Sequence, residues 1–256
     1  MPRYLRFQKP DGSTGFGTLD GETIAVHAGD LFSGAQPTGV TVPMSSVSLL
    51  TPCVPTKMVA LWNNFHALAA KLGQSIPPEP LYFLKANNSF HPHGAPIRVP
   101  PSYAGKVVYE GELGVVIGKR AQRVSEVEAA SCIFGYTCIN DVTAAELLNK
   151  DGSFAQWTRA KGFDTFGVFG PVIATGLDPS ALTVRTILND QERQNFAVSD
   201  MIFSPVQLVS RISQDLTLEP GDVIACGTSI GVGSMKPGST VSIIIEGIGT
   251  LTNTYG

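Results

Sequence analysis

The stretch that most constrains this chain is residues 109–118, because it joins two carboxylates to the start of an apolar strand. Residues 113–117 are mostly apolar and β-branched, which predicts a buried strand. Since side chains two apart on a strand share a face, Glu110 and Glu112 should lie side by side. A hard divalent cation held by oxygen ligands would relieve their repulsion and desolvation. Taken alone, the pair fits a solvated strand end equally well.

Two further charged residues, Asp141 and Lys161, follow along the chain. Asp141 ends a short strand at residues 138–143. Thr143, followed three residues later by Glu146, has the form of a capping box, which predicts a helix directly after this acid. Further along, Lys161 stands between apolar neighbours and before a glycine. Two glutamates, one aspartate and one lysine could together form a metal site that binds an anionic substrate.

The order and spacing of four motifs resemble the fumarylacetoacetate hydrolase family. They are Glu-x-Glu-Leu at 110–113, Asp-Val-Thr-Ala at 141–144, Lys-Gly-Phe-Asp-Thr-Phe at 161–166 and Gly-Thr-Ser-Ile-Gly-Val-Gly at 227–233. The family usually has proline where this chain has Ser229. The resemblance extends over residues 50–250. The first residues resemble the small N-terminal β domain of the family's bacterial branch, whose enzymes act on acylpyruvates and on 2-hydroxyhepta-2,4-dienedioate.

The fold expected from periodicity is a strand-rich α+β structure with few helices. The 27 glycines and 18 prolines suit many short strands joined by turns. Helix-start patterns follow Ser125 and Ser204. The resemblance implies more, namely a mixed β-roll of the family's C-terminal type at residues 51–256 after a small β domain at residues 1–50. Three strands are expected in that first domain, at residues 4–7, 15–19 and 23–26.

The resemblance also implies a role for each candidate site residue. Thr228 lies in a glycine-rich turn whose hydroxyl and N–H groups suit a substrate carboxylate. Lys85 is a second candidate for substrate contact, although a solvated strand end would explain it equally well. Lys161 and His66 would be the catalytic residues, one stabilising developing charge and the other deprotonating water. The metal, Mg2+ or Mn2+ with Ca2+ as an alternative, would be held by Glu110, Glu112 and Asp141.

His66 falls in a short helix pattern at residues 62–73, with asparagine at its start, Lys71 in its last turn and Gly73 at its end. The family places its catalytic histidine in a short lid helix here. Relatives commonly carry glutamate three residues after the histidine, where this chain has Ala69. A carboxylate there would raise the basicity of the imidazole. Its absence favours reactions that need no activated water.

Three functional hypotheses follow. The first is a metal-dependent hydrolase of carbon–carbon bonds in 2,4-dioxo carboxylates such as acylpyruvates, in which the metal and Lys161 stabilise the departing pyruvate enolate. The second is an isomerase, decarboxylase or hydratase of a 2-hydroxy-dienoate in aromatic catabolism, which also runs through an enolate. The third is a catalytically silent family member that serves as a binding protein. The intact acids and Lys161 argue against the third.

Composition limits the partners and the compartment. The formal net charge is −3 and no run of lysine or arginine stands out, which argues against nucleic acid and anionic membranes. Neither a membrane span nor a signal sequence is apparent, so we expect a cytoplasmic protein. The four cysteines have no CxxC spacing and should be buried thiols. The expected partners are a small oxo-acid substrate and, by resemblance, a second copy in a homodimer.

Overall fold

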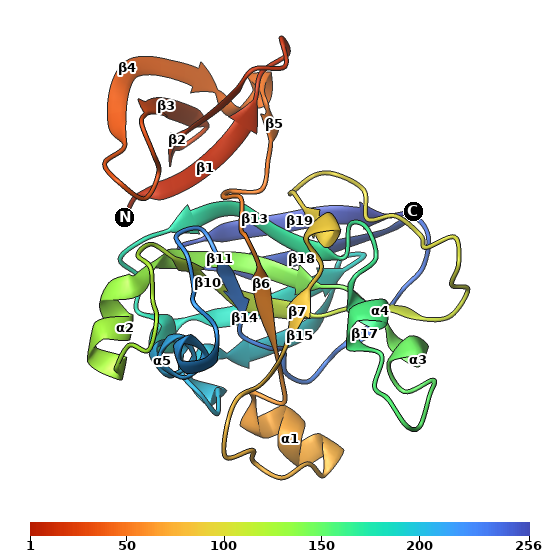
Figure 1. Ribbon diagram of the computed structural model, residues 1–256. Helices are drawn as coiled ribbons and strands as arrows, with labels where there is room; N and C mark the ends of the chain where they lie inside the picture. The colour runs from red at the N-terminus through yellow and green to blue at the C-terminus, as the bar shows by residue number, and fades with distance from the viewer.

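The computed structural model describes residues 1–256 and is built mainly from strands, with five short α-helices (Figure 1). The strands form a twelve-stranded sheet, a four-stranded sheet and a three-stranded sheet. This arrangement confirms the prediction of a strand-rich α+β fold.

The largest sheet contains both the N-terminal strands and the strands that carry the candidate site. In spatial order it consists of β4 (Gln36–Pro43), β3 (Thr23–Ala28), β2 (Thr14–Asp20), β1 (Arg3–Gln8), β13 (Gly167–Ala174), β11 (Ile133–Asp141), β10 (Gly111–Ile117), β16 (Val223–Ala225), β6 (Met58–Trp62) and β7 (Leu81–Lys85), with β5 (Ser48–Leu49) beside β1 and β8 (Phe90–His91) beside β13. The sheet is mixed, because β16 pairs with β6 and β8 with β13 in parallel.

The other two sheets are smaller. The four-stranded antiparallel sheet packs against β10, β11 and β13 of the large sheet, so that the main core lies between the two. Its spatial order is β15 (Gln191–Ala197), β14 (Thr183–Leu188), β18 (Ser239–Ile245) and β19 (Gly249–Tyr255). The three-stranded sheet consists of β12 (Thr143–Ala144), β9 (Val107–Tyr109) and β17 (Gly233–Met235).

Strand alternation in β10 separates the main core from the candidate site. Leu113, Val115 and Ile117 face the main core between the sheets. Val116 belongs to a second apolar cluster on the opposite face of the large sheet. Because Glu112 is an even number of residues from Val116, it lies on this second face. One face of β10 therefore packs into the main core, and the other face carries Glu112 of the candidate site.

The helices are short and mostly peripheral. The capping patterns predicted at Ser125 and Ser204 are confirmed, since each serine side chain accepts a hydrogen bond from a backbone N–H of the first turn. The second and fifth helices pack against each other. The helices are α1 (His66–Leu72), α2 (Glu126–Cys132), α3 (Ala145–Leu148), α4 (Trp157–Lys161) and α5 (Pro205–Asp215), with 3-10 turns at η1 (Met44–Ser46), η2 (Asn87–Ser89), η3 (Pro179–Ala181) and η4 (Val198–Asp200).

The capping box predicted at Thr143 and Glu146 is wrong. Thr143 lies in β12, and α3 begins at Ala145 without a side-chain cap. The Thr143 hydroxyl instead donates to Glu110 Oε1 at 2.8 Å. The Glu146 N–H donates to the Tyr103 hydroxyl at 3.1 Å. The Thr143 hydroxyl thus donates to a neighbouring carboxylate instead of accepting a hydrogen bond from a helix N–H.

The predicted start of α1 is also wrong, whereas its end is confirmed. Trp62 ends β6, and the Asn64 amide donates to the carbonyl oxygens of Cys226 and Phe203 rather than capping a helix. The capping role falls to Asp200, which accepts a hydrogen bond from the N–H of Ala67 at 3.0 Å. Gly73 closes the helix in the left-handed conformation, with φ of 64°, as the pattern predicts.

The N-terminal strands confirm the three segments expected before residue 27. They form an antiparallel unit at one end of the molecule, away from α1 (Figure 1). Strand β1 also pairs with β13, so the unit is continuous with the large sheet. A domain boundary near residue 50 stays a prediction.

The four cysteines are free and buried, as expected. None of the helices has the length and apolar character needed to cross a membrane.

Asp222 anchors the segment that enters β6. Its carboxylate is completely buried and accepts hydrogen bonds from Thr56, from the backbone and ammonium group of Lys57, and from the backbone of Glu219. We expect Asp222→Ala to lower the free energy of unfolding by about 3 kcal/mol, because all of these donors lose one shared acceptor. Urea denaturation measures this change.

Asp215→Ala is the matched control for that measurement, because Asp215 makes a single side-chain hydrogen bond, accepted from the Tyr82 hydroxyl near the surface. It should cost about 1 kcal/mol or less. Equal losses in the two variants would contradict the anchoring role of Asp222.

Candidate metal centre and active site

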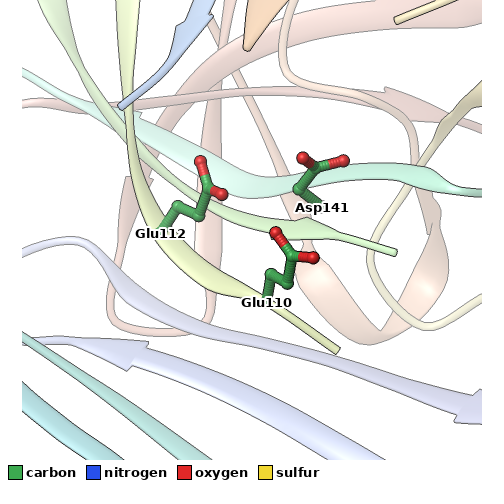
Figure 2. Close-up of side chains that lie close together, drawn as sticks. All are labelled: Glu110, Glu112 and Asp141. Atoms are coloured by element: carbon green, nitrogen blue, oxygen red, sulfur yellow. The ribbon is translucent and has the colours of Figure 1, made fainter. Parts of the chain in front are cut away.

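Three carboxylates meet at the end of the large sheet. Glu112 lies in β10, Glu110 directly precedes that strand and Asp141 ends β11. One oxygen from each side chain lies within 4.8 Å of the others (Figure 2). The backbone fixes this meeting, since the N–H of Asp141 donates to the carbonyl oxygen of Glu110 at 2.9 Å. The structure thus brings together the three residues that the sequence grouped as metal ligands.

Glu112 is the carboxylate with the fewest partners for its negative charge. It is completely buried, and its Oε2 accepts a hydrogen bond from the N–H of Gly227 at 2.8 Å. Its Oε1 is also buried but has no hydrogen-bond partner. Burial raises the pKa of Glu112 well above its ordinary value, and the charges of Asp141 and Glu110 raise it further. An unpaired carboxylate oxygen of this kind is costly unless a cation binds it.

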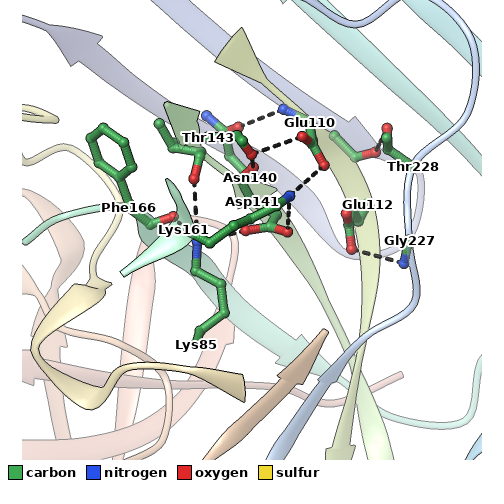
Figure 3. A network of polar contacts seen from close by, with 12 residues as sticks. Lys85, Glu110, Glu112, Asn140, Asp141, Thr143, Lys161, Phe166, Gly227 and Thr228 are labelled. Carbon is green, nitrogen blue, oxygen red and sulfur yellow. Dashed lines mark hydrogen bonds and ion pairs between the residues drawn. The ribbon is translucent and has the colours of Figure 1, made fainter. Parts of the chain in front are cut away.

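The other two carboxylates are paired with buried lysines (Figure 3). Lys161, the last residue of α4, donates to Glu110 Oε2 at 2.8 Å and to Asp141 Oδ2 at 2.6 Å. Lys85, the last residue of β7, donates to Asp141 Oδ1 at 2.5 Å. Burial disfavours the charged form of Lys161, but the charges of Asp141 and Glu110 outweigh it and raise the pKa of the ammonium group. Lys161 therefore remains a cation.

The two lysines differ in the donors they have left. Lys85 also donates to the carbonyl oxygens of Phe166 and Val142, and its side chain is fully buried. All three of its N–H bonds are used, so the predicted substrate contact of Lys85 has no free donor. Lys161 uses two of its three N–H bonds, and its side chain is 5% exposed. Lys161 keeps one free N–H, from which a substrate oxygen can accept a hydrogen bond.

The donor set fits a hard divalent cation. Three carboxylates face two ammonium groups, and the carboxylate left over is Glu112, whose Oε1 lacks a partner. Oxygen ligands in this number suit Mg2+, Mn2+ and Ca2+. Glu110 is oriented by two groups besides Lys161, because its Oε1 accepts from Thr143 and its N–H donates to Asn140 Oδ1 at 3.1 Å. The ligand side chains are thus held in place before any ion binds.

Thr228 lies in the loop that follows β16, beside Glu112. Its hydroxyl donates to the carbonyl oxygen of Gly111 at 2.8 Å and accepts from Gln194 Nε2 at 2.9 Å. The backbone N–H groups of Thr228 and Ser229 have no acceptor within the chain. The predicted carboxylate contact therefore has backbone donors at hand, while the hydroxyl proton is already committed.

Gln194 is a positioning residue that the sequence did not reveal. It is 1% exposed, and its Oε1 accepts from the N–H of Gly111 at 3.0 Å and from the Thr186 hydroxyl at 2.8 Å. Its Nε2 donates to the Thr228 hydroxyl, so Gln194 links the Thr228 loop to Gly111, the residue between the two glutamates. The only signal was a glutamine in a strand otherwise rich in polar residues, where a solvated position is the usual interpretation.

His66 is exposed at the first position of α1, and its imidazole makes no hydrogen bond within the chain. Ala69, three residues later, is completely buried. A glutamate at that position would therefore have to enter the core rather than lie beside the imidazole. The catalytic role of His66 stays a prediction, and the structure supplies no acidic partner for it.

Comparison with protein families identifies the class of protein to which this fold and site correspond. Residues 57–255 match the family described as fumarylacetoacetate (FAA) hydrolase C-terminal. Residues 3–52 match a family described as Rv2993c-like, N-terminal. The chain belongs to the fumarylacetoacetate hydrolase family, which confirms the resemblance seen in its motifs.

Individual relatives narrow the comparison further. The chain is 42% identical to Protein Rv2993c of Mycobacterium tuberculosis, over 98% of this chain and 97% of that protein. It is 34% identical to the oxaloacetate tautomerase YisK of Bacillus subtilis, over 93% and 84%. The crystal structure of 2-hydroxyhepta-2,4-diene-1,7-dioate isomerase from Mycobacterium marinum matches with 40% identity and a TM-score of 0.90, over 100% and 98%. The fold is therefore the strand-rich α+β fold of this family.

Proposed function

We propose that this protein is a divalent-metal-dependent enzyme that stabilises the enolate of a 2-oxo carboxylate and thereby catalyses keto–enol tautomerisation or isomerisation. One contrast carries the proposal. The charge-stabilising groups, three carboxylates and Lys161, form a single cluster, whereas the histidine expected to activate water is exposed and has no acidic partner. Stabilising an enolate needs the first set of groups, whereas hydrolysis also needs a water activated as a nucleophile.

The residues divide the work as follows. Glu110, Glu112 and Asp141 would hold the ion, which would act as a Lewis acid toward the 2-oxo group. Lys161, kept protonated by its raised pKa, would donate its remaining N–H to the oxygen on which negative charge gathers. The free N–H groups at Thr228 would bind the substrate carboxylate. The net reaction moves one proton from C3 to the C2 oxygen by way of water. The C3–H bond and the C2–O π bond break as a C2–C3 double bond and an O–H bond form.

Two similar proteins support this reaction class. The Bacillus subtilis relative is an oxaloacetate tautomerase, and the Mycobacterium marinum structure is that of a 2-hydroxyhepta-2,4-diene-1,7-dioate isomerase. Both reactions move a proton and a double bond next to a 2-oxo or 2-hydroxy carboxylate, which is the chemistry that an enolate-stabilising site accelerates.

Hydrolysis of acylpyruvates is the second candidate function. Water attack at the 4-oxo group would release a carboxylic acid and the same pyruvate enolate. The observation that favours it is the solvent-accessible imidazole of His66 at the start of α1, which could accept a proton from water. No carboxylate orients the imidazole toward a water, so hydrolysis should be the slower reaction.

The two candidates are separated by measuring both reactions on one preparation with Mg2+. Loss of enol absorbance from oxaloacetate and phenylpyruvate reports tautomerisation, and pyruvate release from acetylpyruvate reports hydrolysis. We expect tautomerisation to be accelerated more strongly, and His66→Ala to leave it largely unchanged. Efficient pyruvate release without tautomerisation, abolished by His66→Ala, would establish the second candidate instead. Acceleration of neither reaction would refute both.

A further inference from the structure

Three aromatic side chains form a half-buried group next to the carboxylates, and the chemistry described so far does not use them. The rings of Phe83 and Trp157 are stacked, with centroids 4.8 Å apart and an interplanar angle of 19°. The ring of Trp62 lies 5.6 Å from that of Trp157. We call these three residues the aromatic wall. All three retain partial exposure, so solvent reaches the wall.

Strand register places the aromatic wall on the sheet face that carries the metal ligands. Phe83 and Lys85 are two apart on β7 and therefore share a face, and Lys85 reaches Asp141 from that face. Trp62 of β6 pairs directly with Leu81, which is two residues before Phe83. Paired residues point to the same side of a sheet. The wall therefore continues the surface on which the carboxylates lie.

Lys161 joins the wall to the ionic cluster. Its Nζ, which is bound to Glu110 and Asp141, lies 5.3 Å from the centroid of the Phe83 ring. Trp157 precedes Lys161 by four residues on α4, so the two side chains lie one turn apart on the same helix face. A substrate oxygen that accepts the free N–H of Lys161 would lie about 3 Å from Nζ. Because Nζ is 5.3 Å from the Phe83 centroid, that oxygen is within roughly 8 Å of the wall.

We propose that the aromatic wall binds the substituent at C3 of the 2-oxo acid, and that the preferred substrate carries a planar apolar group there rather than a second carboxylate. This inference rests on the proposed function and adds the substrate class to it. An aryl ring gains from stacking against the wall. A carboxylate placed there would lose its hydration without gaining a partner.

The nearest cation outside the cluster does not change this preference. Arg159 follows Trp157 by two residues on α4, which turns it to a different side of the helix, and its residue is exposed. A second substrate carboxylate on the wall would therefore meet rings and not the guanidinium group. The wall therefore discriminates between 2-oxo acids by the polarity of the group at C3.

Phenylpyruvate and oxaloacetate are the two probes, since they share the 2-oxo carboxylate and differ in the substituent. With the Mg2+-loaded protein, we expect a higher kcat/KM for tautomerisation of phenylpyruvate. Trp157→Ala should lower that value about tenfold, the size expected for a lost aromatic contact. The value for oxaloacetate should change by less than about twofold. Trp157→Phe should retain the preference, and Thr158→Ala, at an exposed neighbouring position, should match the wild type.

Calorimetry provides a readout that does not depend on turnover. The Mg2+-loaded wild type should bind phenylpyruvate about tenfold more tightly than pyruvate, and Trp157→Ala should remove this difference. Equal losses for both probes in Trp157→Ala would show that the wall only supports Lys161, and would overturn the inference. If no probe is tautomerised but the binding preference and its loss are observed, the proposed reaction fails and the wall assignment stands. Trp62→Ala repeats the test should Trp157→Ala not fold.

Discussion

Replacing Glu112 with glutamine should abolish divalent-metal binding and nearly all turnover while the protein remains folded. Glutamine has the same size and can still accept the N–H of Gly227, but it carries no charge. Loss of a ligand should weaken metal affinity by on the order of a hundredfold or more, since even groups behind a ligand contribute factors of 10 to 100. Isothermal titration calorimetry with Mg2+ and Mn2+ measures the affinity directly.

Thermal stability supplies the control for Glu112→Gln. The wild type holds a buried carboxylate oxygen without a partner, so removing its charge should leave the metal-free protein at least as stable. Added Mg2+ should raise the melting temperature of the wild type and not that of the variant. Wild-type metal affinity in Glu112→Gln would refute the ligand assignment.

Lys161→Met should reduce turnover on the order of a hundredfold or more while metal binding is retained. The ammonium group carries the free donor that we assign to the developing negative charge, and methionine removes both the charge and the donor. Because the ammonium group is paired with Glu110 and Asp141, its loss should not weaken the attraction of these carboxylates for a cation. Steady-state kinetics and metal calorimetry on the same preparation measure the two effects.

Lys161→Arg is the companion variant. Arginine keeps the positive charge but cannot reproduce the geometry of a compact ammonium group, so its turnover should fall between those of the wild type and Lys161→Met. If Lys161→Met turns over at the wild-type rate, Lys161 is a structural ion-pair partner and the enolate is stabilised by other groups.

Local patterns sufficed to predict the elements that a short stretch of sequence controls. The apolar, β-branched run at residues 113–117 correctly predicted a buried strand. The capping signals at Ser125 and Ser204 were confirmed, because each cap is satisfied by residues within its own first turn. The sequence also grouped Asp141 with the two glutamates as a possible metal site. In the structure the three carboxylates do lie close together.

The errors arose where a side chain finds a distant partner. Thr143 was expected to cap a helix, but it donates to Glu110, 33 residues away. An asparagine, at residue 63 or 64, was expected to stand at the start of α1, yet Asn64 accepts a hydrogen bond from the N–H of Phe203, 139 residues away. Gln194 was not recognised at all, since its partners at Gly111 and Thr228 come from strands and loops far apart in sequence. A polar residue with local alternatives cannot be assigned before the sheet order is known.

The two lysines illustrate the same limit. In sequence, both Lys85 and Lys161 are single cations beside apolar residues, and both were candidates for contact with the substrate. Only their acceptors separate them, because Lys85 uses every N–H on Asp141 and two carbonyl groups, and Lys161 keeps one N–H free. The difference follows from where β7 and α4 end relative to β11, which no short pattern contains.

The central claim, that the three carboxylates hold a metal on which turnover depends, is tested most directly by metal titration. The protein is stripped with EDTA, dialysed and titrated with Mg2+ or Mn2+, while bound metal and the tautomerisation rates of phenylpyruvate and oxaloacetate are measured on the same samples. We predict no activity without metal and a rate that rises in proportion to bound metal up to one ion per chain. Full activity in the stripped protein, or metal bound without any gain in rate, would contradict the claim.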